Sequence, residues 1–215
     1  MSESDSGLWL GLDTSTGVSV ALARPGRILA SRAVSATNVH AEQLMPLVSE
    51  VMAESGHALA DLAGVVVGIG PGPFTGLRVG LVTARTMALA LDIPVYGVCS
   101  LDIIAAEAVD QGLEDFLVAT DARRKEVYVA SYAEGRRVSG PEVVKPLEAA
   151  TDAVVVGRGA RLYPEAFPHS RGPEGPSAAV LCDVVVRERY ELLDPEPLYL
   201  RRPDAMEPHQ PKRVS

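Results

Sequence analysis

The sequence has little of several features that would assign a protein to a particular class. Only two of its 215 residues are cysteines, Cys99 and Cys182, and they lie far apart in apolar segments. This excludes a disulfide framework and zinc-ligand spacing, so we expect two buried thiols and a cytoplasmic protein. No unbroken run of about 18 apolar residues occurs, so we expect no membrane-spanning segment.

Positive charge is also scarce, because the formal net charge of the chain is −8. Residues 1–112 carry 11 acidic and 5 basic side chains, whereas residues 113–215 are nearly balanced, with 17 and 15. An acidic first half argues against an extended surface for nucleic acid. If the protein acts on RNA, we therefore expect it to do so through a partner.

Recognisable catalytic and metal-binding arrangements are missing as well. His40 opens a predicted helix, but the residue four positions later is Leu44, so no histidine pair lies on one helical face. Neither cysteine has around it the strained turn that an activated nucleophile requires. We predict no catalytic residue and no metal site.

The apolar pattern that is present predicts alternating strands and helices. Three short strands separated by turns come first, and single helices and strands then alternate. The predicted strands cover residues 8–12, 18–23, 28–34, 65–69 and 94–97, and the predicted helices cover 40–55, 77–91 and 101–109. This order requires parallel later strands with helices on the sheet faces, and it is typical of a ribonuclease-H-like or actin-like ATPase half.

The second half of the chain repeats the first. Residues 116–121 form an apolar strand that ends in aspartate, as residues 8–13 do, at an offset of 108 positions. Further strands at 126–132 and 153–157 and a closing helix over 177–189, with Ser177 as N-cap, complete a degraded copy. We predict an α/β fold of two lobes, 1–112 and a smaller 113–195, followed by a flexible tail over 196–215.

Two segments are candidates for phosphate or nucleotide binding. Asp13 ends the first strand and is followed by hydroxyl residues, with Asp121 as its counterpart in the second half; the two could hold Mg²⁺ or simply cap their turns. The glycine–proline loop of residues 70–76 could expose amides at a helix start, or it could be a rigid packing turn. Thr75 is the predicted N-cap there. The candidate residues are Asp13, Thr14, Ser15, Gly70, Gly72, Thr75 and Gly76.

The two long helices of the first half are candidates for a partner interface. The helix at 77–91 is apolar nearly all round, so it must be covered on both sides. The sheet covers one side, and either a second polypeptide or the second lobe covers the other; we favour a polypeptide partner, because methionines on the neighbouring helix suit an adaptable surface. The predicted interface residues are Leu44, Met45, Val48, Met52, Leu77, Leu81, Val82 and Arg85.

Several segments together resemble the TsaB (YeaZ) family of bacterial tRNA threonylcarbamoyladenosine biosynthesis proteins. They are residues 10–16 (LGLDTST), 40–46 (HAEQLMP) and 70–80 (GPGPFTGLRVG), with 121–128 and 197–201 in addition. The glycine–proline motif is highly specific, whereas many actin-like ATPases share the aspartate–threonine turn. Pro73 departs from the family pattern, because many relatives have serine there.

The resemblance implies a two-lobed actin/Hsp70-like fold with a reduced second lobe. The implied role is a non-catalytic cytoplasmic subunit that supports the TsaD paralogue, with TsaE and TsaC, in placing threonylcarbamoyl on adenosine 37 of tRNA. Helices of the first lobe would dock on TsaD or, in its absence, on a second copy of the chain. The resemblance implies no intrinsic cofactor, with ATP or ADP at the interface with TsaD left open, and tRNA contact only through the complex.

Two other functions remain open. One is a self-contained actin-like ATPase or small-molecule kinase that uses Asp13 and Asp121. The other is a glycopeptidase-like metalloenzyme, which would require a bound metal. We favour the non-catalytic subunit, because the family motifs are specific and the catalytic residues are few.

Overall fold

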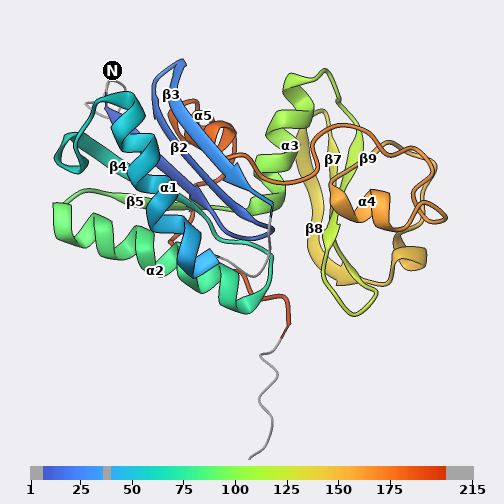
Figure 1. Ribbon diagram of the computed structural model, residues 1–215. Coiled ribbons are helices and arrows are strands. Elements are labelled where there is room, and N and C mark those ends of the chain that lie inside the picture. The colour runs from blue at the N-terminus through green and yellow to red at the C-terminus, as the bar shows by residue number, and fades with distance from the viewer. Residues whose placement is uncertain (1–6, 36–39, 202–215) are drawn as a thin grey trace, which may run out of the picture.

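A computed structural model describes residues 7–35 and 40–201 and contains two sheets side by side (Figure 1). The first sheet has the strand order β3-β2-β1-β4-β5. Its strands are β1 (Leu8–Asp13), β2 (Val18–Arg24), β3 (Arg27–Val34), β4 (Leu62–Gly68) and β5 (Val95–Val98). β1 pairs antiparallel with β2 and parallel with β4, and all six residues of β1 are buried. A strand covered on both faces needs a nearly continuous apolar sequence, which is what β1 and β4 have.

Helices cover both faces of this first sheet (Figure 1). α1 (His40–Ser55) and α2 (Phe74–Leu91) pack on the face formed by Leu10, Leu12 and their neighbours. α3 (Ser100–Asp110) and α5 (Ala178–Val186) pack on the opposite face, against Trp9. The alternation of side chains along β1 therefore supplies two separate core regions from one strand.

The second sheet repeats this arrangement with four strands, in the order β8-β7-β6-β9. They are β6 (Phe116–Asp121), β7 (Val127–Ala133), β8 (Arg136–Val144) and β9 (Val155–Val156). Of the short elements, η2 (Leu59–Asp61) precedes β4 in the first half, η3 (Pro146–Ala149) lies between β8 and β9, and α4 (Arg158–Leu162) follows β9. β6 pairs antiparallel with β7 and parallel with β9, as β1 does with β2 and β4. The predicted duplication is confirmed, and so is the predicted two-lobed actin-like α/β fold with a reduced second lobe.

Two expectations about the end of the chain are wrong. The helix expected to close the second lobe is α5, which packs on the first sheet, where the amide of Ala178 donates to Ser19 Oγ at 2.9 Å. Small residues explain this, because a Cβ on Gly11 would meet the Cys182 sulfur at 2.7 Å. Residues 196–201 of the predicted tail pack on the body, with Leu198 N donating to Ile69 O. The remainder, 202–215, lies outside the described residues, and the lobe boundary at residue 112 stays a prediction.

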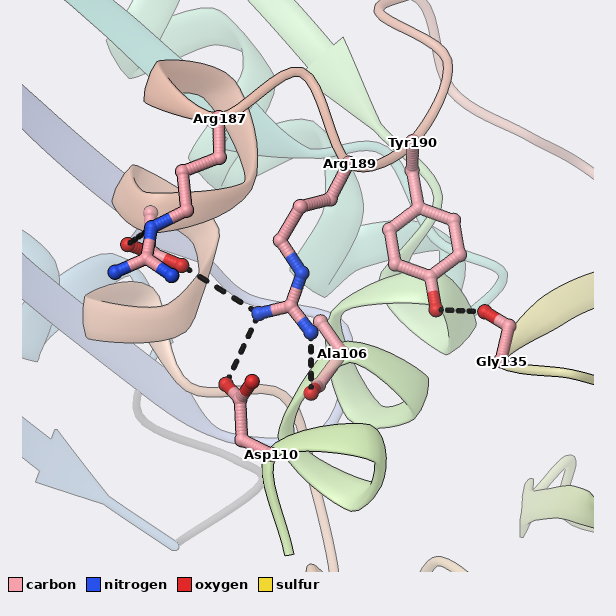
Figure 2. Close-up of polar contacts among 7 residues, drawn as sticks. Ala106, Asp110, Gly135, Arg187, Arg189 and Tyr190 are labelled. Atoms are coloured by element: carbon pink, nitrogen blue, oxygen red, sulfur yellow. Dashed lines mark hydrogen bonds and ion pairs between the residues drawn. The ribbon is translucent and has the colours of Figure 1, made fainter. Parts of the chain in front are cut away.

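The segment after α5 ties the two halves together (Figure 2). The Arg189 guanidinium donates to Asp110 Oδ2 at 3.0 Å and to the Ala106 carbonyl of α3 at 3.1 Å, and it lies 3.4 Å from Asp183 Oδ2 of α5. The next residue, Tyr190, donates its hydroxyl to the Gly135 carbonyl in the β7–β8 turn at 2.8 Å. The adjacent residues Arg189 and Tyr190 therefore connect α3, which packs on the first sheet, with the β7–β8 turn of the second sheet.

One helix, α2, meets the length and hydropathy criteria for a membrane-spanning helix, although we expected no such segment from the sequence. By length and composition alone, α2 is apolar enough to cross a membrane, with a mean hydropathy of 1.2 over 18 residues, 39% of them buried. Core helices pass the same test, and α2 contributes Leu77 and Leu81 to the core of the first sheet.

Candidate functional site

The predicted nucleotide residues gather where β1 ends, and Asp13 is at the centre of this group. Its Oδ1 accepts hydrogen bonds from the amide and the hydroxyl of Ser15, both at 2.8 Å, and its Oδ2 accepts one from Ser100 Oγ at 2.7 Å. Burial raises the pKa of the Asp13 carboxyl, although these three hydrogen bonds oppose the shift. Both oxygens of Asp13 are therefore engaged within the chain.

The glycine–proline loop packs directly onto the turn that follows Asp13. Thr14 Oγ1 donates to the Gly76 carbonyl at 2.8 Å, which joins the β1–β2 turn to the first turn of α2. A Cβ on Gly72 would lie 2.7 Å from the Ser15 carbonyl oxygen, and one on Gly80 would lie 2.4 Å from Thr14 Oγ1. Glycine is required at both positions because the two segments approach so closely. This geometry fits a rigid packing turn better than an open phosphate loop.

Thr75 does not take the predicted place. The N-cap of α2 is Pro73, which makes no side-chain capping bond, and Thr75 is exposed within the first turn. The prediction failed because proline at the N-cap moves the helix start two residues earlier. The other six candidates, Asp13, Thr14, Ser15, Gly70, Gly72 and Gly76, do lie together; their role in nucleotide binding stays a prediction.

Asp121 ends β6 as Asp13 ends β1, but its surroundings differ. Its Oδ1 accepts from the amide of Arg123 at 2.8 Å, and its Oδ2 lies 3.4 Å from the Arg123 guanidinium. Asp13, by contrast, lines a cavity of about 330 Å³ together with Arg158 and Glu174 from the second half. Among residues 7–35 and 40–201, no group of three or more His, Cys, Asp or Glu side chains is placed to hold a metal ion.

Most of the predicted interface residues belong to the core of this chain. Packed against the first sheet, and 6% exposed or less, are Leu44, Val48, Met52, Leu77 and Leu81. The prediction was wrong for these five as surface residues, because an apolar helix does not reveal which of its faces meets the sheet. Met45, Val82 and Arg85 are exposed and remain candidates.

The exposed face of α2 still carries large apolar side chains. Val82 is 61% exposed and Leu89 is 85% exposed, and Met45 of α1 is 44% exposed. A cavity of about 490 Å³ follows this face, lined by Val82, Arg85 and Thr86 of α2 and by Pro195, Pro197 and Tyr199 of the C-terminal segment, among others. Sequence reasoning missed Leu89 and the C-terminal residues. The positions 82, 85, 86 and 89 have the helical spacing that could have identified this outer face.

Tyr199 fastens the C-terminal segment to the start of α2. Its ring stacks on Phe74 with 4.8 Å between ring centroids, and its hydroxyl accepts from Arg78 Nε at 3.1 Å. The Arg78 guanidinium lies 3.8 Å from the centre of the Phe74 ring, a cation–π contact. The outer face of α2 and residues 195–199 therefore form one surface.

Comparisons with known proteins agree with the fold and the motifs. The family described as TsaD, tRNA N6-adenosine threonylcarbamoyltransferase, matches residues 30–162. The tRNA threonylcarbamoyladenosine biosynthesis protein TsaB of Escherichia coli is 33% identical over 170 residues, which cover 73% of each chain. An uncharacterised protein of Mycobacterium tuberculosis is 42% identical over 179 residues, covering 83% of this chain and 82% of the relative. The structure of YeaZ from Pseudomonas aeruginosa superposes with a TM-score of 0.76 at 31% identity, covering 90% of this chain and all of the other.

Proposed function

Because the chain belongs to the TsaB family of tRNA threonylcarbamoyladenosine biosynthesis proteins, we propose that it is the non-catalytic subunit that docks on a TsaD paralogue. In this role it supports the paralogue, together with TsaE, in modifying adenosine 37 of tRNA. The proposed location is the cytoplasm, where the tRNA substrate is.

The observation that carries this proposal is the outer face of α2. Val82 and Leu89 expose most of their side chains on one side of a helix whose other side is buried in the core. An exposed apolar surface that is rimmed by polar side chains, here Arg85 and Thr86, is typical of a protein–protein interface. The adjoining cavity offers a recess for side chains of the docked protein.

The engagement of Asp13 supports a non-catalytic role. Both oxygens of Asp13 accept hydrogen bonds from Ser15 or Ser100, so a metal ion or a nucleophile would have to compete with these contacts for the carboxylate. We propose that the chain has no cofactor of its own, and that any ATP or ADP lies at the interface with the paralogue. In the absence of the paralogue, the same face of α2 is proposed to pair with a second copy of the chain.

A charge placed on this face tests the proposal. Val82→Asp should weaken binding of the chain to its TsaD paralogue at least tenfold, because a carboxylate would be buried in an apolar contact. Val138→Asp on β8 is the matched control, since Val138 is 63% exposed and Val82 is 61% exposed. Binding is measured by biolayer interferometry, and self-association by light scattering of the chain alone.

The two variants separate the possible results. Loss of binding with Val82→Asp alone supports docking through α2. Undiminished binding of Val82→Asp, or equal loss with Val138→Asp, would contradict it. Leu81→Asp is unsuitable here, because Leu81 is only 3% exposed and an aspartate would disrupt the core.

A further inference from the structure

A small cavity with a concentration of positive charge lies between the two halves of the molecule. It has a volume of about 260 Å³ and is bounded by the glycine–proline loop, the turn after β6 and the C-terminal segment. Three arginines, Arg123, Arg124 and Arg201, are among its lining residues, and no acidic side chain is among those that the described part of the chain contributes. In a chain with a net charge of −8, this concentration of cations is unusual.

The turn that carries two of these arginines has a strained backbone. Arg123, Arg124 and Lys125 have φ angles of +62°, +55° and +60°, the left-handed region that non-glycine residues seldom occupy. The turn is closed by hydrogen bonds between Ala122 and Glu126 and between Glu126 and Arg123. Strain of this kind is concentrated at ligand-binding sites, and here it presents three consecutive cations.

The arginines are positioned by contacts that leave part of their surface exposed. Arg201 donates to the Ala122 carbonyl at 2.8 Å and forms an ion pair with Glu126, which anchors the C-terminal segment to the turn. Arg123 pairs with Asp121, yet 56% of its side chain remains exposed. A planar guanidinium held in this way can still donate to the oxygens of an incoming anion.

We propose that this cavity binds a phosphate group of an RNA backbone, so that the chain itself contacts the RNA that the complex modifies. The choice of RNA rests on the proposed function, whereas the phosphate chemistry rests on the arginines. The cations lie on an exposed turn that a polyanion can pass over. Tyr199 lines both this cavity and the one beside the outer face of α2, so the RNA site borders the proposed docking face.

This inference revises the expectation from overall charge that tRNA is contacted only through a partner. Net charge averages over the whole chain, whereas phosphate binding depends on local charge. No acidic side chain among the described residues of the first half lines this cavity, which is contributed largely by the second half and the C-terminal segment.

Reversal of charge on the turn tests the inference in the complex with the TsaD paralogue. The double variant Arg123→Glu/Arg124→Glu should weaken binding of a fluorescently labelled tRNA transcript at least tenfold. It should also reduce the slope of log K against log salt by about two, because two phosphate contacts are lost. Arg27→Glu/Arg136→Glu is the control: it makes the same charge change at two exposed arginines outside this cavity and should bind like the wild type.

Three further measurements make the result decisive. Docking on the paralogue, measured by biolayer interferometry, must survive in both double variants; if the wild type itself fails to dock, the proposed function fails instead. Thermal melts monitored by circular dichroism establish that the variants are folded, and the milder Arg123→Gln/Arg124→Gln replaces the reversal if they are not. Unchanged tRNA affinity, or loss of ATP and ADP binding with tRNA binding intact, would overturn the inference, the latter by assigning the cavity to a free nucleotide.

Discussion

At the scale of single residues, Asp13 occupies a position at a strand end that is typical of a catalytic carboxylate, but both of its oxygens accept hydrogen bonds within the chain. It stands at the end of β1, and its carboxylate accepts from Ser15 and Ser100, two residues that are 85 positions apart. Ser100 Oγ also accepts from the Gly70 amide at 3.1 Å. The carboxylate thereby links the β1–β2 turn, the start of α3 and the glycine–proline loop, which is a structural task.

Substitutions of Asp13 should therefore affect stability in a pH-dependent way. Because burial raises its pKa, the folded state holds the proton more tightly than the unfolded state does. The stabilising contribution is complete below the unfolded pKa and is lost as the pH rises through the folded pKa. Asp13→Asn cannot titrate, so the difference between its free energy of unfolding and that of the wild type should shift in favour of the variant as the pH rises above about 4, the ordinary pKa of an aspartate. Urea unfolding at several pH values measures this.

Asp13→Ala is the companion variant. It leaves the Ser15 amide and two buried hydroxyls without their acceptor, so it should cost about 2 kcal/mol or more. If the free energies of unfolding of Asp13→Asn and of the wild type changed in parallel with pH, the pKa of Asp13 would be the same in the folded and unfolded states, which would contradict the first prediction. Nucleotide turnover by the purified chain that is abolished in Asp13→Asn would instead favour the ATPase alternative.

At this scale the sequence predicted which residues gather around Asp13 but not how closely they pack. The gathering of Asp13, Thr14 and the loop glycines followed from their positions at strand ends, which parallel strands bring to one edge. Whether that edge is open or closed depends on the 2.7 Å approach of the Gly72 Cβ position to Ser15. A close approach of this kind between two distant segments leaves no periodic pattern in a sequence.

At the scale of elements, α2 has two faces with different roles. Gly76, Leu77, Gly80, Leu81, Ala84, Met87 and Ala88 form its buried face. Gly80 lets the helix approach the turn after β1, because a Cβ there would lie 2.4 Å from Thr14 Oγ1. Val82 and Leu89 lie on the other face, where this chain leaves them exposed.

Adjacent alanine substitutions on α2 should distinguish these faces. Leu81→Ala removes a core side chain that is 3% exposed and should lower the free energy of unfolding by about 3 kcal/mol. Val82→Ala should change it by less than about 0.5 kcal/mol, because alanine favours the helix and little buried area is lost. Urea unfolding of the two variants measures the difference. Similar losses from both would mean that the outer face is covered within the chain.

Elements with a strong local period were predicted well, and those defined by distant contacts were not. The apolar spacing in residues 40–55 predicted α1 with the bounds that it has, His40–Ser55. β8 was missed, because much of it is exposed at the edge of the second sheet and its apolar residues do not alternate clearly. α5 was found as a helix but assigned to the wrong sheet, because sheet choice depends on small residues such as Gly11 more than 160 positions earlier.

At the scale of the whole molecule, the two halves are joined by segments that cross between them. α3 packs on both sheets, with Ile103 in one core region and Leu101 and Ile104 in another. Asp102 of the same helix accepts from the Tyr132 hydroxyl at 2.7 Å and lies 3.3 Å from Arg137 Nε of β8. Residues 189–201 add a second connection, from α5 through β5 to the turn after β6. A partner docked on the outer face of α2 would therefore rest on a segment that also reaches the second sheet.

Tyr190 allows a test of this connection. Burial raises the pKa of Tyr190 to about 12, so its hydroxyl stays protonated at neutral pH and donates to the Gly135 carbonyl (Figure 2). Tyr190→Phe should remove only this bond while the ring keeps its edge contact with Tyr132. The expected cost is about 1 kcal/mol, felt mainly in the β7–β8 hairpin.

Hydrogen exchange followed by mass spectrometry can localise that effect. In Tyr190→Phe, amides of β7 and β8 should exchange faster, whereas amides of β1 and β4 in the first sheet should keep their protection. Tyr96→Phe is the matched control, because Tyr96 is 36% exposed at the edge of the first sheet, remote from Gly135. Equal loss of protection in both sheets would show that the halves open only as one unit. Unchanged protection would show that the Tyr190 bond does not hold the hairpin, and the connection would then rest on α3 and on the contact of Arg201 with the Ala122 carbonyl.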